Sequence, residues 1–293
     1  MGLPVLTESS ARAQTLQCLD RLPKLSPSMT QLLVQLSQRN CEVLDLAKIL
    51  ERDPVLSGQV LRLSNSAIFG RLRPVASVRH AVAMVGISAI RKFALAASIA
   101  NLFSRTKMAA HFSIRRFNVH SVATATLVEL LSEEVAFEHA DDAFLAGLLH
   151  DIGKLLIAVA LSRQYDEILA LLSVTGGTLI EAERSVIGID HAELSGLAVS
   201  RWELSEAIQW AACYHHQPSG APAVESTRAR KASLSLGVHC ADAYVNHLGM
   251  SVLADAVAAE TTPTLEIPGF TFSQERVLER FQKELPRLCD LFR

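Results

Sequence analysis

The chain has 293 residues, a formal net charge of −2 and five cysteines. This length fits one or two domains, and a composition of 49% hydrophobic and 20% charged residues excludes a disordered chain. The near-neutral charge gives no signature of a nucleic-acid-binding protein. The apolar stretch 93–103 is too short to cross a bilayer, and 143–161 is interrupted by His150, Asp151 and Lys154. Without a signal peptide or paired cysteines, a cytoplasmic protein with no membrane association is expected.

Leucine and alanine are abundant and aromatic residues make up only 5%, which predicts an all-α fold. Ser26-Pro27 and Asp53-Pro54 each pair a capping residue with proline at the first helical position. A further helix is predicted from Ser88, and 65–74 is predicted to be a loop.

Cap and breaker residues also divide the second half into helices. Thr178 and Asp190 are each followed by glutamate at the capping-box spacing, and Gly176 ends the helix before them. Helices are predicted over 113–131, 142–149, 229–248 and 273–292, and Pro286 can break the last of these. Three further helices are predicted to start at Thr178, Asp190 and Ser205.

The seam between the two halves is predicted at 104–110. The segments are an N-terminal helical subdomain (15–105), a helical core with a metal site (110–250), and a C-terminal loop and helix (251–293). Only His80 precedes residue 110, and the other nine histidines follow it. Acid–base or metal chemistry is therefore predicted in the second half.

Histidines and aspartates in that half follow a pattern that indicates a divalent metal site. Imidazole suits Fe, Mn, Zn or Ni, and a carboxylate can bridge two ions. The adjacent pair His150-Asp151 grips one ion most easily at a helix end, and Gly153 fits a change of direction there. One buried histidine on a helix is more often a hydrogen-bonded core residue than a ligand. His111, His139, His239 and His247 are interpreted as ordinary surface or capping groups. The predicted ligands, for one or two ions, are His120, His150, Asp151, His191, His215, His216 and Asp242.

The segment His150-Asp-Ile-Gly-Lys154, with His120 before it and Asp242 after it, resembles the HD superfamily of metal-dependent phosphohydrolases. More narrowly, the chain resembles the HDOD family (HD-related output domain) over about residues 15–250. The motifs that carry this resemblance are Leu22-Pro-Lys-Leu25, Glu51-Arg-Asp-Pro54, Leu61-Arg-Leu-Ser-Asn-Ser-Ala67, Ala143-Phe-Leu-Ala-Gly-Leu-Leu149 and Trp202-Glu-Leu-Ser-Glu206.

The resemblance implies an N-terminal helical subdomain packed on an HD-like helical core. It also implies a bacterial signalling role, with a receiver or sensor domain among the protein partners. The metal-binding pattern of the related HD-GYP phosphodiesterases, carried over to this chain, implies a first metal on His120, His150, Asp151 and Asp242. A second metal shares Asp151 and takes His191, His215 and His216. Lys154 would then face a substrate phosphate. The segment Gln217-Pro-Ser-Gly-Ala-Pro222 departs from the HD-GYP pattern, which weakens the expectation of cyclic di-GMP hydrolysis.

Three functions are weighed. A non-catalytic signalling module acting through protein contacts, with 22–103 as its partner surface, is favoured. The alternative is a metal-dependent phosphohydrolase, in which Asp151 and Lys154 would be catalytic. Nucleic-acid binding is the least favoured. It would use a helix-turn-helix over 45–63 and a basic cluster of Arg71, Arg73, Arg79, Arg91 and Lys92.

Overall fold

The computed structural model describes residues 8–19, 32–36, 42–65, 74–104, 106–222, 231–253 and 264–289. Within these residues the regular structure is helical, and the one β feature is an isolated parallel bridge between Phe137 and Ala232. The all-α prediction is confirmed. The predicted start of a helix at Ser26 lies outside the described residues, and so does most of the predicted loop 65–74.

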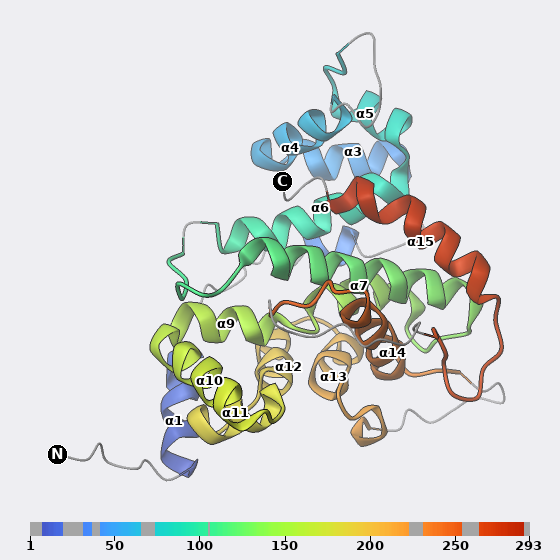
Figure 1. Cartoon of the computed structure of the whole chain (residues 1–293). Helices are drawn as coiled ribbons and strands as arrows, with labels where there is room; N and C mark the ends of the chain where they lie inside the picture. The colour runs from blue at the N-terminus through green and yellow to red at the C-terminus, as the bar shows by residue number, and fades with distance from the viewer. Residues whose placement is uncertain are drawn as a thin grey trace.

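The N-terminal half of the chain forms a small lobe on top of a long helix (Figure 1). Its core consists of leucines and valines that are almost fully buried, including Leu46, Leu50, Leu56 and Val60. Helix α1 is the exception, because it lies away from the lobe and packs beside α11. The helices are α1 (Glu8–Leu19), α3 (Val43–Glu51), α4 (Pro54–Ser64), α5 (Val78–Val85) and α6 (Ile87–Leu102), with residues 32–36 also helical.

The second half is built around α7, which is buried over most of its length and contacts α8, α14 and α15. Helices α9 to α12 lie at one end of it (Figure 1). The helices are α7 (Ile114–Glu134), α8 (Ala143–Leu149), α9 (Ile152–Ala160), α10 (Ser162–Thr175), α11 (Leu179–Ile187), α12 (His191–Arg201), α13 (Glu206–Tyr214), α14 (Leu234–His247) and α15 (Gln274–Cys289).

Several predicted caps form as expected. The Asp53 carboxylate accepts hydrogen bonds from the backbone N–H groups of Val55 and Leu56. Thr178 and Glu181 form a complete capping box. Gly176 ends α10 in the left-handed conformation, at φ +62°. Each of these caps acts between residues within one turn of its own helix end, as the sequence predicted.

Other predicted helix ends hold only in part or differ from the structure. Helix α6 starts at Ile87, so Ser88 lies inside it. The helix predicted from Asp142 to Leu149 is confirmed as α8, but the Asp142 carboxylate accepts from the Ser205 hydroxyl instead of capping that helix. Helix α14 starts only at Leu234, because Ala232 is held in the bridge to Phe137. Helix α15 runs through Pro286 to Cys289 without a break.

A buried ionic cluster joins α6, α7 and α15. Glu129 of α7 contacts both Arg91 and Lys92 of α6, at 2.5 and 2.6 Å, and Lys92 also reaches Glu284 of α15. Arg91 and Lys92 are almost fully buried, so they do not belong to a surface basic cluster. Arg71 and Arg73 lie outside the described residues. The proposed nucleic-acid-binding face therefore loses two of its members.

One stretch among the described residues, Ala140–Ala160, is long and apolar enough to span a membrane by length and composition. It comprises the short turn η2 (Ala140–Asp142), α8 and α9. Most of this stretch is buried inside the protein, 83% over an 18-residue segment, as in the core helix of a globular fold. Helices α5 and α6 are long and apolar enough only if they are counted as one span, and they are bent by 119° at the break between them.

Candidate metal centre

Four side chains from three regions of the fold converge beside α7. His120 comes from the second turn of α7, His150 and Asp151 from the junction of α8 and α9, and Asp242 from α14. Nε2 of His120 lies 3.2 Å from Oδ2 of Asp151 and 3.1 Å from Oδ1 of Asp242. Nε2 of His150 lies 3.5 Å from each of the same two oxygens. Ligand atoms about 2.0–2.2 Å from a tetrahedral ion are about 3.3–3.6 Å apart, so the spacing of these atoms is close to that around a metal ion.

Close packing of α8 on α7 brings these residues together. Gly147 of α8 lies against the backbone of Ala125, and a Cβ at Gly147 would be only 2.6 Å from the Ala125 Cα. Glycine is therefore required there, because a side chain would force the two helices apart. The resulting crossing sets Nε2 of His150 3.3 Å from Nε2 of His120.

A second group forms on the other oxygen of Asp151. Oδ1 of Asp151 lies 3.4 Å from Nε2 of His191 and 3.5 Å from Nε2 of His215. Nε2 of His216 lies 2.8 Å from Nε2 of His191. His191 opens α12, whereas His215 and His216 follow the end of α13. All seven residues predicted as ligands are thus brought together, with Asp151 facing both groups; we call these groups the His120 half-site and the His191 half-site.

Hydrogen bonds on the far side of the rings orient the histidines. Nδ1 of His120, His150 and His215 donates to the backbone carbonyls of residues 250, 147 and 212, respectively. Nδ1 of His191 instead contacts the carboxylate of Glu183 at 2.6 Å. With Nδ1 held on the outer side, each Nε2 points into the interior of the cluster, as in metal-binding histidines.

Two buried atoms at the centre of the cluster have no hydrogen-bond partner. These atoms are Oδ1 of Asp151 and Nε2 of His215, and both residues are fully buried. A buried polar atom without a partner is costly, and native proteins leave few of them. A cation between the two atoms would satisfy both, so the residues present fit a divalent metal.

The protonation of the cluster also suits cation binding. Burial lowers the pKa of His150 and His191, which favours neutral imidazoles. Burial raises the pKa of the Asp151 carboxyl, but the charge of Lys154 and the hydrogen bond from His120 outweigh it and hold that pKa well below the usual range. Burial lowers the pKa of His120, yet its hydrogen bonds with Asp151 and Asp242 raise it to about 9. A metal would have to displace that proton.

The cluster is nearly closed to solvent. The side chains of His120, His150, Asp151 and His215 have no exposed area, whereas His216 is exposed. Nζ of Lys154 lies 2.6 Å from Oδ2 of Asp151, and the lysine side chain is 12% exposed. Approach from outside is therefore from the side of His216 and Lys154.

Two residues at the site were missed by the sequence analysis. Glu183, on α11, accepts hydrogen bonds from both the backbone N–H and the ring of His191. His239, treated as an ordinary histidine, donates from Nδ1 to the backbone carbonyl of His215 at 2.6 Å. No spacing rule links either residue to the ligands. A glutamate on the inward face of an amphipathic helix was the only signal for Glu183.

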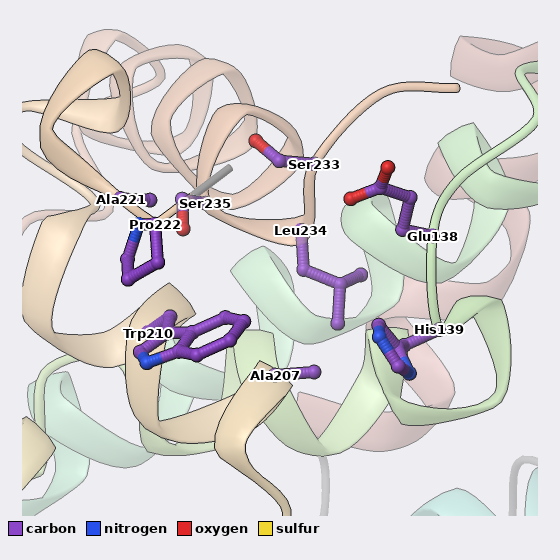
Figure 2. Close-up of a pocket in the computed structure, with 9 residues that line it drawn as sticks. All are labelled: Glu138, His139, Ala207, Trp210, Ala221, Pro222, Ser233, Leu234 and Ser235. Atoms are coloured by element: carbon purple, nitrogen blue, oxygen red, sulfur yellow. The ribbon is translucent and has the colours of Figure 1, made fainter. Parts of the chain in front are cut away.

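A small pocket lies between α13, α14 and the turn that carries the Phe137 bridge (Figure 2). Trp210 forms one side of it, Leu234 its middle, and Glu138 and His139 the opposite side (Figure 2). None of the seven candidate ligands lines it. The lining residues are Glu138, His139, Ala207, Trp210, Ala221, Pro222, Ser233, Leu234 and Ser235.

Comparison with known proteins finds one family for most of the chain. The model of the HDOD domain matches residues 22–218. An uncharacterized protein of Treponema pallidum is 22% identical over 219 residues, which are 70% of this chain and 39% of that protein. The chain thus spans about two fifths of the length of this curated relative.

Solved structures share the fold across nearly the whole chain. An HDOD domain protein of unknown function from Geobacter sulfurreducens superposes with a TM-score of 0.72 at 21% identity, covering 96% of both chains. A candidate phosphohydrolase from Shewanella amazonensis gives 0.69 at 21% identity, covering 96% of this chain and 99% of the other. A candidate signal transduction protein from Marinobacter aquaeolei gives 0.69 at 18% identity, covering 99% and 66%. These likenesses establish the fold.

Proposed function

The chain belongs to the HDOD family, and we propose that it is a signal-transduction output protein whose HD-type core holds one or two divalent metal ions. The observation that carries the metal assignment is the pair of unpartnered buried atoms, Oδ1 of Asp151 and Nε2 of His215. They lie 3.5 Å apart, at the centre of seven ligand-type side chains. His120, His150, Asp151 and Asp242 would hold the first ion. Asp151, His191, His215 and His216 would hold the second.

The closed form of the cluster favours regulation over catalysis. Structural metal sites surround the ion with protein ligands, whereas catalytic sites keep an open position for water or substrate. Five of the seven ligand-type residues are at most 1% exposed, so the core is suited to stabilising one arrangement of α7, α12, α13 and α14. A partner protein, such as a receiver or sensor domain, would then read that arrangement. Leu44, Val55 and Met84, which are exposed on three helices of the N-terminal lobe, support this lobe as the contact surface.

A metal-dependent phosphohydrolase is the second candidate, and Lys154 favours it. Divalent ions at such a site supply Lewis-acid chemistry toward a phosphoester. Nζ of Lys154 lies at the partly open side of the cluster and is held against Asp151, where it would neutralise charge on a phosphate oxygen. His216, the exposed member of the cluster, lies on the route by which a substrate would enter.

Metal analysis of the purified full-length protein tests the first part of the proposal. We expect about one to two ions per chain, lost when His150→Ala and Asp151→Ala are combined. The matched control is His111→Ala, because His111 is exposed and outside the cluster. A folded wild-type protein that takes up no Zn²⁺, Fe²⁺ or Mn²⁺ would disprove the metal assignment.

A screen of cyclic dinucleotides and simple phosphoesters separates the two functions. Metal without turnover supports the output role. Turnover that is lost in Lys154→Ala while the metal stays bound would show that the protein is a phosphohydrolase and contradict the non-catalytic role. For the partner surface, cross-linking in a lysate of the source organism should capture a receiver- or sensor-domain protein. The combined variant Val55→Asp and Met84→Asp, folded and metal-loaded, should lose that partner.

A further inference from the structure

We infer that Glu183 is the positioning residue of the His191 half-site, and this inference rests on the metal-binding role proposed above. Glu183 lies in the middle of α11 and His191 is the first residue of α12. One oxygen, Oε2, accepts from the backbone N–H of His191 at 2.8 Å and contacts its Nδ1 at 2.6 Å. A single carboxylate thus fixes both where α12 starts and how the His191 ring is turned.

The burial of Glu183 is explained if the imidazole is bound to a cation. The side chain is only 3% exposed, and a carboxylate in such surroundings is unfavourable without a positive partner. A carboxylate, imidazole and metal in line form a recurrent arrangement in metalloproteins, in which the carboxylate strengthens the histidine as a ligand.

The half-sites differ in this respect. In the His120 half-site, Nδ1 of both His120 and His150 donates to a backbone carbonyl, which is neutral. A carboxylate makes the His191 ring a stronger electron donor than a carbonyl would. Removal of Glu183 should therefore lower the affinity of the His191 half-site for its ion. The affinity of the His120 half-site should stay the same.

Contacts other than those of Glu183 also hold the turn between α11 and α12, so the loss of Glu183 need not unfold it. Arg12 of α1 pairs with Glu193 in the first turn of α12. Thr15 of α1 donates to the carbonyl of Ile187 at 3.1 Å. The Asp190 side chain caps α12 by accepting from the backbone N–H of Glu193, at 2.8 Å. These contacts hold the backbone and do not touch the His191 ring.

Titration with Co²⁺ tests the inference, because its visible spectrum reports each site and its binding curve gives two affinities. The wild type should bind two ions. Glu183→Ala should weaken one of them about 10- to 100-fold, the usual effect of losing a ligand's hydrogen-bond partner. The remaining spectrum should match that of His191→Ala. Glu183→Gln keeps a hydrogen-bond acceptor without the charge, so it should restore part of the affinity.

Glu181→Gln is the matched control, since it removes a carboxylate from the same helix at the exposed capping box. Its two affinities should equal those of the wild type. Unchanged affinities in both Glu183 variants would overturn the inference, and so would an equal loss at both half-sites or a wild type that binds a single ion. A wild type that binds no Co²⁺ would instead overturn the proposed metal function itself. If Glu183→Ala does not fold, Glu183→Gln decides the result alone.

Discussion

Replacing Gly153 with alanine should damage the His191 half-site through packing alone. Gly153 lies in the first turn of α9, against the start of α12. A Cβ added there would be 2.0 Å from the His191 carbonyl oxygen and 2.8 Å from its carbonyl carbon. Ordinary contact begins at 3.4 Å, so the two helices must separate by roughly 1.4 Å, from 2.0 to 3.4 Å. The atoms in the way are backbone atoms, so rotation of a side chain cannot relieve the contact.

This displacement is large relative to what a metal site tolerates. Ligand distances in such sites hold to within about 0.2 Å, and Nε2 of His191 lies 3.4 Å from Oδ1 of Asp151. Overpacking costs ~1–3 kcal/mol, while alanine in place of glycine in a helix returns at most ~1 kcal/mol. We therefore expect Gly153→Ala to lower the free energy of unfolding by ~1–2 kcal/mol and to lose one bound ion.

Urea unfolding of the metal-free protein and metal analysis of the loaded protein measure the two effects. Gly58→Ala is the control, since a Cβ at Gly58, inside α4, meets nothing within 4 Å. It should stabilise the protein by up to ~1 kcal/mol and keep the full metal content. A Gly153→Ala protein with wild-type stability and two ions would refute the packing argument.

Two further outcomes follow from buried charges. Because the His120 pKa is raised from 6.5 to about 9, its contribution to the stability of the metal-free protein should be complete below pH 6.5 and lost as pH rises through about 9. Thermal unfolding of His120→Gln should lack this loss, and an unchanged decline in that variant would contradict the assignment. Glu129→Leu should destabilise the protein by ~3–5 kcal/mol, because it leaves Arg91 and Lys92 buried without their shared carboxylate. The control is Arg163→Ala, which breaks an exposed ion pair and should change the free energy of unfolding in urea by less than ~1 kcal/mol. Similar losses in the two variants would contradict the stabilising role of the buried Glu129 ion pairs.

The sequence by itself determined the fold class, most helix starts and the seven candidate ligands. Local chemistry explains this success, because a cap such as Asp53 or the Thr178–Glu181 box acts within one turn of its own helix. The pair His150-Asp151 was predicted at a helix end, and it lies at the junction of α8 and α9. The HDOD assignment from these motifs is confirmed over residues 22–218.

Only the tertiary structure decided how those residues meet. Gly153 was assigned to a change of direction, but it is needed because α9 and α12 approach so closely. Glu183 and His239 support the cluster through contacts that no spacing along the chain predicts. Arg91 and Lys92 were predicted to belong to a surface basic cluster, but both are paired with Glu129 inside the protein. Glu129 lies 38 residues from Arg91 along the chain, so no local pattern links them. Side chains distant in sequence determine these environments, so the pattern of residues alone cannot fix them.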